Sequence, residues 1–553
     1  MIQMLKENLK DEIKAAVLKC QYQDLGMDLN VILEKPKDLN HGDYAANIAM
    51  QLTKVAKKNP RIIAEEIIRH LDLEKAHVEK VEIAGPGFIN FFMDKQILTR
   101  AIKEIIEAGS DYGSSNAGNN IKYNVEYVSA NPTGDLHLGH ARGAALGDTL
   151  CRLLAKAGYD VTREYYVNDA GNQIHNLVQS AYARYLEALG MAAEIPEDGY
   201  HGSDIMALGQ QMADQYGEAF VNKLEENYQQ IREISLTFEL NKIKQDLKMF
   251  GVEFDLYTSE QMLYDQNLVE RGIEILQEKG YTYELDGAVW LRSTDFGDDK
   301  DRVLKKSDGS YTYLAPDIAN HIEKLNRGQE KLINIWGADH HGYIARMQAA
   351  ITALGYAKDT LEVDILQMVR LIKDGQEFKM SKRTGKAVTL RDLIEEVGVD
   401  GARYFFVMRS GETQMDFDLN LATEKSNANP VYYAQYAHAR ICSLLRQAEE
   451  RGFQKVLKEQ YPLINHEKEY EVIKLMGDFP MVIADAAKKR RPHLICNYIN
   501  DLASAFHSLY SAEKIIDETN VEKTNEKLAL MNALKITIAN ALTLIGVSAP
   551  ERM

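Results

Sequence analysis

The sequence predicts an α/β protein in three parts: a small α+β unit, a parallel sheet with helical insertions, and an all-α helical bundle. A chain of 553 residues suggests about three or four domains at roughly 150 residues each. A strand, a helix and a strand follow one another over residues 121–167, and the alternation returns over residues 331–369. Long helical patterns with few strand signals then occupy residues 430–545, which is typical of a bundle.

The first part, residues 1–112, has mixed helix and strand signals. A helix is expected to open near Asp43, and short strands flank the turn at residues 85–87. Residues 109–120, GSDYGSSNAGNN, are rich in residue types that favour turns. We therefore expect an exposed linker there.

The second part, residues 121–389, is the predicted sheet domain. Its strand–helix–strand units imply parallel strands with a ligand site at their carboxyl ends. Residues 170–330 have mainly helical patterns and are interpreted as one insertion into this domain. A connecting helical segment at 390–429 leads to the bundle, residues 430–553.

Composition and charge exclude several classes of protein. With 45% hydrophobic and 27% charged residues, the chain is neither disordered nor embedded in a membrane. Its net charge is −17, and residues 121–429 carry nearly all of it, with 33 basic against 49 acidic residues. An acidic centre suits a cationic ligand, and near-neutral ends do not exclude RNA.

The four cysteines are scattered without a CxxC pair, so neither a disulfide framework nor a zinc site is expected. No stretch approaches 18 apolar residues, and the N-terminus is a mixed-charge amphipathic pattern rather than a signal peptide. We expect a cytoplasmic protein.

A turn between the first strand and the first helix ends in His137-Leu138-Gly139-His140. Histidines three apart lie on one face of a helix, and at its first turn free backbone N–H groups attract anions. Gly139 leaves room for a flat ring to approach the backbone. Taken alone, an ordinary pair of surface or core histidines is the more frequent explanation.

A basic loop, FKMSKRTG at residues 378–385, follows the last strand of the predicted sheet. It precedes a helix expected to begin with a capping box of Thr389 and Asp392. Its cations could grip a triphosphate and stabilise charge on leaving pyrophosphate. A solvated charge run is the more frequent explanation of such a loop alone, but the two motifs together are more specific than either.

Together, HLGH and KMSK resemble the paired motifs of class I aminoacyl-tRNA synthetases, which have a Rossmann-type catalytic domain. Further segments are similar to the arginyl-tRNA synthetase family, and the resemblance spans nearly the whole chain. These segments are EYVSANPTGDLHLGHARGAALGD (126–148), YYVNDAGNQI (165–174), WGADHHGYIARM (336–347), YYAQYAHARICS (432–443) and APERM (549–553).

The resemblance implies activation of L-arginine by ATP, with Mg²⁺ on the phosphates, and transfer of arginine to the terminal ribose of its tRNA. It also implies that activation requires bound tRNA. Its catalytic contacts with ATP correspond to His137, His140, Lys379 and Lys382. Further ATP contacts correspond to Gly139, Gly337, Asp339, Met380 and Ser381, although Asp339 could equally be a helix N-cap.

The arginine pocket of the family corresponds to Glu126, Asn131, Tyr313 and Asp317. A guanidinium presents a fork of donors that a carboxylate can accept in pairs, so acidic residues suit this role. Tyr313, four residues before Asp317, is expected on the same helical face and against the substrate. Asn131 would hold the amino-acid end of the substrate.

Family positions near the anticodon correspond to Tyr433, Ala437, Tyr498 and Met553. Aromatic faces stack on splayed bases and cations bind phosphate, so Tyr432, Tyr436 and the basic run at 488–491 are further candidates. Tyrosines at helical spacing are more often core residues. The N-terminal unit resembles the family's additional domain, which touches the tRNA elbow.

Two alternatives remain at this stage. One is another nucleotide-activating enzyme, such as a small-molecule adenylyltransferase, which the long C-terminal helices and the KMSKR loop disfavour. The other is a non-catalytic RNA-binding paralogue, which the intact histidines and lysines disfavour. No dimer element stands out, so a monomer is expected.

Overall fold

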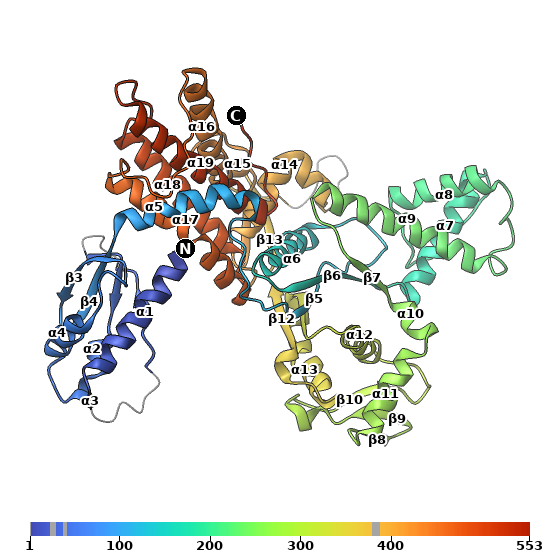
Figure 1. Cartoon of the computed structure of the whole chain (residues 1–553). Coiled ribbons are helices and arrows are strands. Elements are labelled where there is room, and N and C mark those ends of the chain that lie inside the picture. The colour runs from blue at the N-terminus through green and yellow to red at the C-terminus, as the bar shows by residue number, and fades with distance from the viewer. Residues whose placement is uncertain (1, 23–28, 37–40, 379–386) are drawn as a thin grey trace.

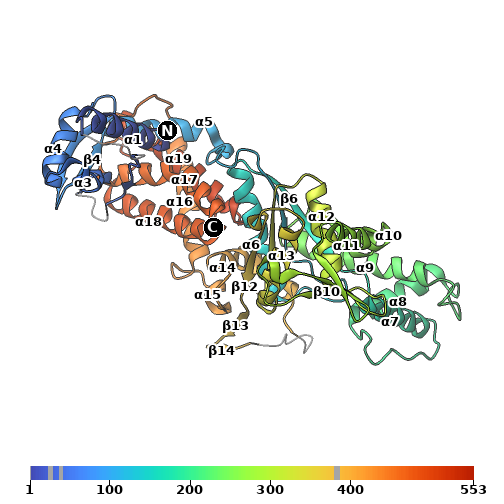
Figure 2. The ribbon, with the colours of Figure 1, turned by 90° about the horizontal axis from the view of Figure 1, so that it is seen from below.

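The computed structural model describes residues 2–22, 29–36, 41–378 and 387–553 (Figure 1). Its fold class is the predicted one: a central parallel sheet lies between a small α+β unit and an all-α bundle. Seen from below, the N-terminal unit lies at one end of the molecule and helices α7 and α8 lie at the other (Figure 2). The bundle and the sheet lie between them.

The N-terminal unit packs helices on an antiparallel sheet with strand order β1-β2-β4-β3. Asp43 does not open a helix as expected. Its backbone N–H donates to the carbonyl of Phe91 at 2.8 Å, so the chain enters a strand instead. The elements are α1 (Ile2–Lys19), β1 (Leu33–Glu34), β2 (Tyr44–Ala46), α2 (Ile48–Gln51), α3 (Thr53–Ala56), α4 (Pro60–His70), β3 (Val78–Ala84) and β4 (Phe88–Met93).

The expected exposed linker at 109–120 is in fact packed against the bundle. It follows α5 (Lys95–Ala108) and begins with the 3₁₀ turn η2 (Gly109–Asp111). Tyr112 is buried, and its hydroxyl donates to the carbonyl of Met476 at 2.8 Å. The amide of Asn540 donates to the carbonyls of Gly109 and Tyr112. The turn-forming composition was a poor guide because the single aromatic side chain anchors the segment.

The central sheet is parallel throughout, in the order β12-β11-β5-β6-β7. From β5 the chain first adds β6 and β7 on one side, and later adds β11 and β12 on the other side. The direction of winding therefore changes between β5 and β11, and parallel sheets bind ligands at such a point. The strands and the helices between them are β5 (Lys122–Glu126), α6 (Leu138–Lys156), β6 (Asp160–Val167), β7 (Leu256–Ser259), β11 (Lys331–Gly337), η4 (Ala338–Tyr343), α13 (Ile344–Ala353), η5 (Lys358–Thr360) and β12 (Leu361–Leu366).

The expected single insertion at 170–330 is divided in two, because β7 within it pairs with β6 and belongs to the central sheet. The first insertion contains α7 (Asn172–Ala188), α8 (Ser203–Tyr216) and α9 (Tyr228–Met249). The second, which also carries a small antiparallel sheet, contains α10 (Glu260–Asp265), α11 (Leu268–Glu278), β8 (Thr282–Leu285), β9 (Ala288–Leu291), η3 (Ser293–Phe296), β10 (Arg302–Lys305) and α12 (Leu314–Asn326).

The expected helical connection at 390–429 also contributes a strand. Its β15 pairs in parallel with β13, which in turn pairs with β14 in antiparallel orientation. These elements are β13 (Val369–Lys373), β14 (Gln376–Glu377), α14 (Leu390–Val407), β15 (Met415–Asp418) and α15 (Leu419–Thr423).

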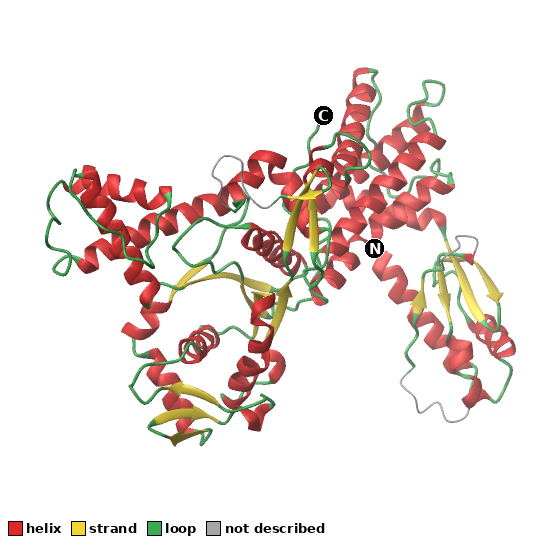
Figure 3. Cartoon of the chain, turned by 180° about the vertical axis from the view of Figure 1, so that it is seen from behind, coloured by secondary structure: helices red, strands yellow, loops and turns green. Residues whose placement is uncertain are grey.

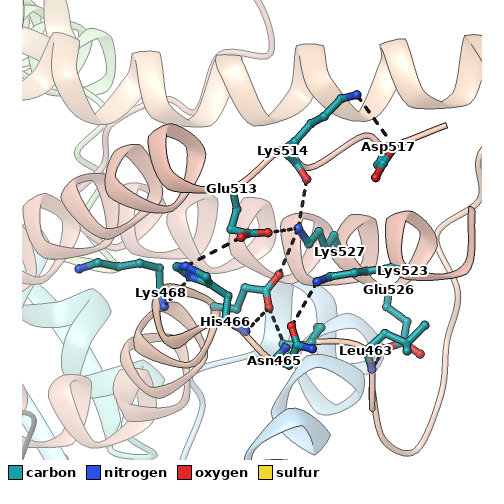
Figure 4. A network of polar contacts seen from close by, with 12 residues as sticks. Leu463, Asn465, His466, Lys468, Glu513, Lys514, Asp517, Lys523, Glu526 and Lys527 are labelled. Carbon is teal, nitrogen blue, oxygen red and sulfur yellow. Dashed lines mark hydrogen bonds and ion pairs between the residues drawn. The ribbon is translucent and has the colours of Figure 1, made fainter. Parts of the chain in front are cut away.

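The C-terminal part consists of four long helices joined by loops, with no strand among its residues, all of which are described (Figure 3). A buried network closes one end of it (Figure 4). The ammonium of Lys527 lies 2.6 Å from Glu513 and 3.7 Å from Glu469, and donates to the carbonyl of Lys514. It thereby ties the α18–α19 loop to the start of α17. The helices are α16 (Pro430–Glu450), α17 (Glu467–Lys488), α18 (His493–Ala512) and α19 (Val521–Leu544).

Candidate active site

A sharp turn follows β5 and carries the chain towards the histidine motif. Val128 and Ser129 adopt positive φ values of 69° and 38°, which side chains with a Cβ rarely take. The backbone N–H of Tyr166 donates to the Ser129 hydroxyl at 3.1 Å, and the Tyr165 hydroxyl donates to the carbonyl of Ala130 at 2.7 Å. Strand β6 thus holds a backbone that would otherwise cost about 1–3 kcal/mol per strained residue.

The two histidines meet at the N-terminus of α6, but His137 is its N-cap rather than part of the first turn. Its Nδ1 accepts from the backbone N–H of Gly139 at 3.1 Å, and the Nδ1 of His140 accepts from the backbone N–H of His137 at 3.3 Å. The rings stack with centroids 3.7 Å apart.

Burial favours the neutral form of both histidines. Burial lowers the pKa of His137, and burial together with the neighbouring His137 lowers the pKa of His140 to about 3. Since Nδ1 accepts a hydrogen bond in each ring, the proton lies on Nε2. Two imidazole N–H donors are therefore available at the N-terminal end of α6, an arrangement that suits an anion.

Lys379, Met380, Ser381 and Lys382 lie outside the described residues, but the flanks of their loop are described. Before it, Phe378 N–H donates to the carbonyl of Leu371 at 2.8 Å. After it, Leu390 N–H donates to the carbonyl of Leu136 at 2.8 Å, and Thr389 forms a β-bridge with His137. The exit of the loop is therefore adjacent to the histidine turn.

The predicted capping box after the loop is confirmed. Thr389 N–H donates to the carboxylate of Asp392 at 3.0 Å, and Asp392 N–H donates to the Thr389 hydroxyl at 3.2 Å. This reciprocal pair satisfies free donors of α14 and fixes where the helix begins.

Glu126, Glu260 and Asp317 form an acidic pocket at the carboxyl edge of the sheet. Burial raises the pKa of Asp317 to about 7, and the nearby charges of Glu126 and Glu260 add to this. The Tyr343 hydroxyl, which donates to Asp317 at 2.5 Å, opposes the rise. Burial also raises the pKa of Glu260, although hydroxyl groups of tyrosines lie beside it.

Glu126 differs from the other two carboxylates because it is already paired. The fully buried ammonium of Lys324 forms an ion pair with it, and the amide of Asn320 donates to the same oxygen at 3.3 Å. The remaining negative charge of the pocket therefore lies on Glu260 and Asp317. A planar cation with several N–H donors would satisfy both.

The other two residues predicted for this pocket are exposed. Tyr313 is the N-cap of α12 and is 82% exposed, one turn before Asp317. Asn131 is exposed in the turn after β5. Sequence reasoning missed Glu260, which follows directly after β7. Had β7 been recognised as a strand within the expected insertion, Glu260 would have been predicted at the carboxyl edge of the central sheet.

Gly337 ends β11 on the other side of the β5–β11 crevice. A Cβ at this position would lie 2.5 Å from the present position of the exposed Asp339 carboxylate, which would have to turn away. Gly337 itself is at the N-cap position of η4, and Asp339 lies within that turn. The alternative role of Asp339 as a helix N-cap is therefore wrong. Its carboxylate is exposed and 3.3 Å from His340.

A half-exposed aromatic surface lies on the bundle. The rings of Tyr432 and Tyr436 stack at 6.0 Å, Tyr433 lies 4.9 Å from the ring of His507, and the guanidinium of Arg440 lies over Tyr510. Aromatic faces beside a cation suit unstacked bases.

Other residues predicted near the anticodon are placed differently. Ala437 is fully buried, and Tyr498 is 5% exposed with its hydroxyl bonded to the carbonyl of Leu475, so neither side chain reaches the surface. Met553 is 57% exposed. The basic run at 488–491 is divided, because Arg490 forms ion pairs with Glu362 and Asp364 of β12.

Neither a metal-binding cluster nor a membrane-spanning helix occurs among the described residues. No group of three or more His, Cys, Asp or Glu side chains there is arranged to hold a metal ion. None of the helices in those ranges combines the length and apolar character needed to span a membrane.

Family models match three consecutive stretches of the chain. The model "Arginyl tRNA synthetase N terminal domain" matches residues 3–93, and "tRNA synthetases class I (R), catalytic domain" matches residues 101–442. "DALR anticodon binding domain" matches residues 434–553.

Similar proteins extend along the whole chain. It is 61% identical to the arginine–tRNA ligase of Bacillus subtilis (strain 168) and 60% identical to that of Bacillus velezensis, over 100% of this chain and 99% of each relative. A structure titled as a putative arginyl tRNA synthetase from Campylobacter jejuni is 36% identical, with a TM-score of 0.76, and covers 83% of this chain and 100% of that one. Thermus thermophilus arginyl-tRNA synthetase, 22% identical with a TM-score of 0.75 over 99% of both chains, shares the fold. From its site and these relatives, the chain belongs to the arginyl-tRNA synthetase family.

Proposed function

We propose that this chain is an arginine–tRNA ligase that activates L-arginine with ATP and transfers it to the 3′-terminal ribose of its tRNA. The observation that carries this function is the pairing of two sites at one sheet edge. A buried acidic pocket that suits a guanidinium lies on one side, and two neutral histidines at a helix N-terminus lie on the other. Identity of about 60% with arginine–tRNA ligases over the full chain supports the same activity.

ATP is the substrate that family members of class I use, and we assign its phosphates to His137 and His140. Lys379 and Lys382 would grip the triphosphate and stabilise charge on the leaving pyrophosphate, beside Met380 and Ser381. Gly139 would admit the adenine. Gly337 and Asp339 would contact the ribose, because they end the neighbouring strand across the crevice.

Mg²⁺ would arrive with the triphosphate. This ion keeps several waters and usually needs only one or two carboxylates besides substrate phosphates. When bound, the ion would neutralise charge on the β- and γ-phosphates.

Arginine would place its guanidinium between Asp317 and Glu260, with Glu126 and its partner Lys324 completing the wall. Tyr313 would cover the side chain, and Asn131 would hold the amino-acid end. A lysine ammonium cannot offer the same fork of donors, so the unmet carboxylates would exclude it.

The reaction then needs mainly positioning. The arginine carboxylate attacks the α-phosphorus of ATP, pyrophosphate leaves, and arginyl-adenylate forms. A hydroxyl of the terminal ribose next attacks the carbonyl carbon of the adenylate, and AMP leaves. Holding the reacting groups in line accounts for a large share of such rate enhancements.

For tRNA, we assign the anticodon to the aromatic surface around Tyr433 and to Met553. Ala437 and Tyr498 would act there only indirectly, by supporting α16 and α18 from the core. The N-terminal unit would contact the tRNA elbow. We further propose that activation requires bound tRNA and that the enzyme is a cytoplasmic monomer.

Arginine-dependent exchange of pyrophosphate into ATP, measured with and without tRNA, tests this function. We expect exchange with arginine only, and only when its tRNA is present. Exchange with a different amino acid would overturn the substrate assignment. Exchange at full rate without tRNA would overturn the proposed dependence alone. ATP consumption without any amino acid substrate would favour a small-molecule adenylyltransferase.

A further inference from the structure

Helix α9 belongs to two hydrophobic cores. Near its start, Ile231 and Leu236 pack with α7 and α8 in the first insertion. Near its end, Ile243 and Leu247 pack in the main core with the central sheet and the bundle. Figure 1 shows α9 running from the α7–α8 pair towards α14 and the sheet. The helix therefore connects the first insertion to the main core.

One face of α9 contacts the approach to the histidine motif. The ammonium of Lys242 lies 2.9 Å from the carboxylate of Asp135, which is two residues before His137. The same ammonium lies 2.6 Å from Asp204 on α8 and 3.4 Å from Glu239 on α9. Lys242 therefore joins the histidine turn to the insertion.

The cluster depends on the lysine remaining charged. Burial alone would lower the pKa of Lys242, but the carboxylates around it outweigh burial and raise that pKa. Glu239 is fully buried, and one of its carboxylate oxygens has no hydrogen-bond partner in the described structure. Lys242 is thus the cation that compensates this buried carboxylate.

The same face contacts the exit of the basic loop. Asp246, one turn after Lys242, is 2% exposed and forms an ion pair with Arg391 in the first turn of α14. Arg391 follows Leu390, whose N–H donates to the carbonyl of Leu136. The approach to His137 and the chain after residue 386 are therefore bonded to each other and to adjacent turns of one helix.

We propose that Lys242 and Asp246 are positioning residues for ATP, which set the relative placement of the two segments that bind its phosphates. The inference rests on the proposed function, because it assigns those segments to ATP. Lys242 holds Asp135 and with it the N-terminus of α6, and Asp246 holds Arg391 and with it the start of α14. Neither side chain itself touches the nucleotide.

Asp135→Asn and Lys242→Met test the first tie. We expect each to raise the KM for ATP about 10- to 100-fold, since small misplacements of reacting groups cost that much. The KM for arginine should stay within about twofold, because the acidic pocket lies on other elements. Lys242→Arg should restore most of the ATP affinity. The double variant should have no higher a KM for ATP than Lys242→Met, because the two substitutions break the same ion pair.

Lys248→Met is the matched control, since Lys248 lies on the same helix with a side chain that is 77% exposed. It should leave both KM values unchanged. Arg391→Met tests the second tie at a half-exposed residue and should also raise the KM for ATP. Should Lys242→Met fail to fold, Asp135→Asn and Arg391→Met decide, because both positions are solvent-accessible.

Direct ATP binding by equilibrium dialysis separates this inference from the proposed function. Wild-type protein that binds ATP but never charges tRNA with arginine would overturn the function. Folded Asp135→Asn and Arg391→Met variants that bind ATP as tightly as wild type would overturn the positioning role. An equal rise in the KM for ATP and for arginine would also overturn it, because a general destabilisation of the fold would explain that result.

Discussion

At Asp317, burial and two neighbouring carboxylates together produce a group that titrates near neutrality, with a pKa of about 7. Burial disfavours the charged form of the free side chain, but it also strengthens the interaction of that charge with a bound guanidinium. Hydrogen bonds to charged groups contribute about 1.5–3 kcal/mol. If arginine binds where we propose, this side chain should set both how tightly and at which pH it binds.

Asp317→Asn should raise the KM for arginine about 10- to 100-fold, since it removes the charge and keeps the shape. The KM for ATP should not change, because we assign the nucleotide to other residues, at the N-terminus of α6. Steady-state exchange kinetics with each substrate varied in turn measure both values. An equal loss of ATP affinity would contradict the pocket assignment.

The pH dependence of arginine use follows from the same residue. Below about pH 7 Asp317 takes up a proton and loses its charge, whereas the guanidinium stays charged. The kcat/KM for arginine should therefore fall with decreasing pH, approaching about tenfold per pH unit. His140, whose pKa is about 3, does not titrate in this range. Asp317→Asn should show a nearly flat profile, and a wild-type profile that rises towards acid would exclude this account.

At the scale of single residues, sequence predicted the histidine turn and the acidic character of the pocket but not its full composition. Patterns and resemblance located His140 and Asp317. They gave no sign of Lys324, a buried cation that neutralises Glu126, because a lysine on a helix is ordinarily exposed. The partners of a buried charge come from the packing of distant elements, and local sequence does not encode that packing.

At the scale of elements, periodicity predicted the bundle closely. The helical patterns expected over residues 430–545 are α16 to α19. The first strand, which was expected to begin the strand–helix–strand unit at residue 121, ends at Glu126, because the chain turns sharply at Val128 and Ser129. Neither residue type signals a positive φ. Short strands such as β7 were also missed, since four residues show too little alternation to separate from a helix.

The loops of the bundle depend on Lys527 in the network of Figure 4. Lys527→Met should destabilise the protein by about 3–5 kcal/mol, because it leaves the buried carboxylate of Glu469 without its cation. Urea denaturation followed by circular dichroism measures the change. Lys514→Met, at an ion-paired but 76% exposed side chain, is the control and should change stability by at most about 1 kcal/mol. Similar midpoints for both variants would show that the network contributes little.

At the scale of the whole molecule, two arginines, one buried and one half-buried, join its parts. Arg403 on α14 pairs with Asp148 on α6 and donates to the carbonyls of Phe250, after α9, and Ile545, after α19. Arg490 at the end of α17 pairs with β12. Arginines that form these internal ion pairs are not available to bind RNA phosphates. The chain, with a net charge of −17, therefore has few cations left for that purpose.

Binding of tRNA should therefore weaken with salt only moderately. About three phosphate contacts would give a slope of log affinity against log salt concentration near −2 to −3. Filter binding between about 50 and 200 mM salt measures it. A slope of about −6 or steeper would indicate a broad basic surface that the charge distribution does not provide.

The packed segment at 109–120 has a consequence for dividing the protein. Tyr112 lies under α17 and is bonded to Met476, and Asn540 on α19 holds the backbone on either side of it. A shortened chain that begins after residue 120 would leave an apolar socket open in the bundle beside Phe479. The end of the N-terminal unit thus completes the core of the C-terminal bundle. Expressing the two parts as separate chains should therefore destabilise the bundle, although they lie at opposite ends of the sequence.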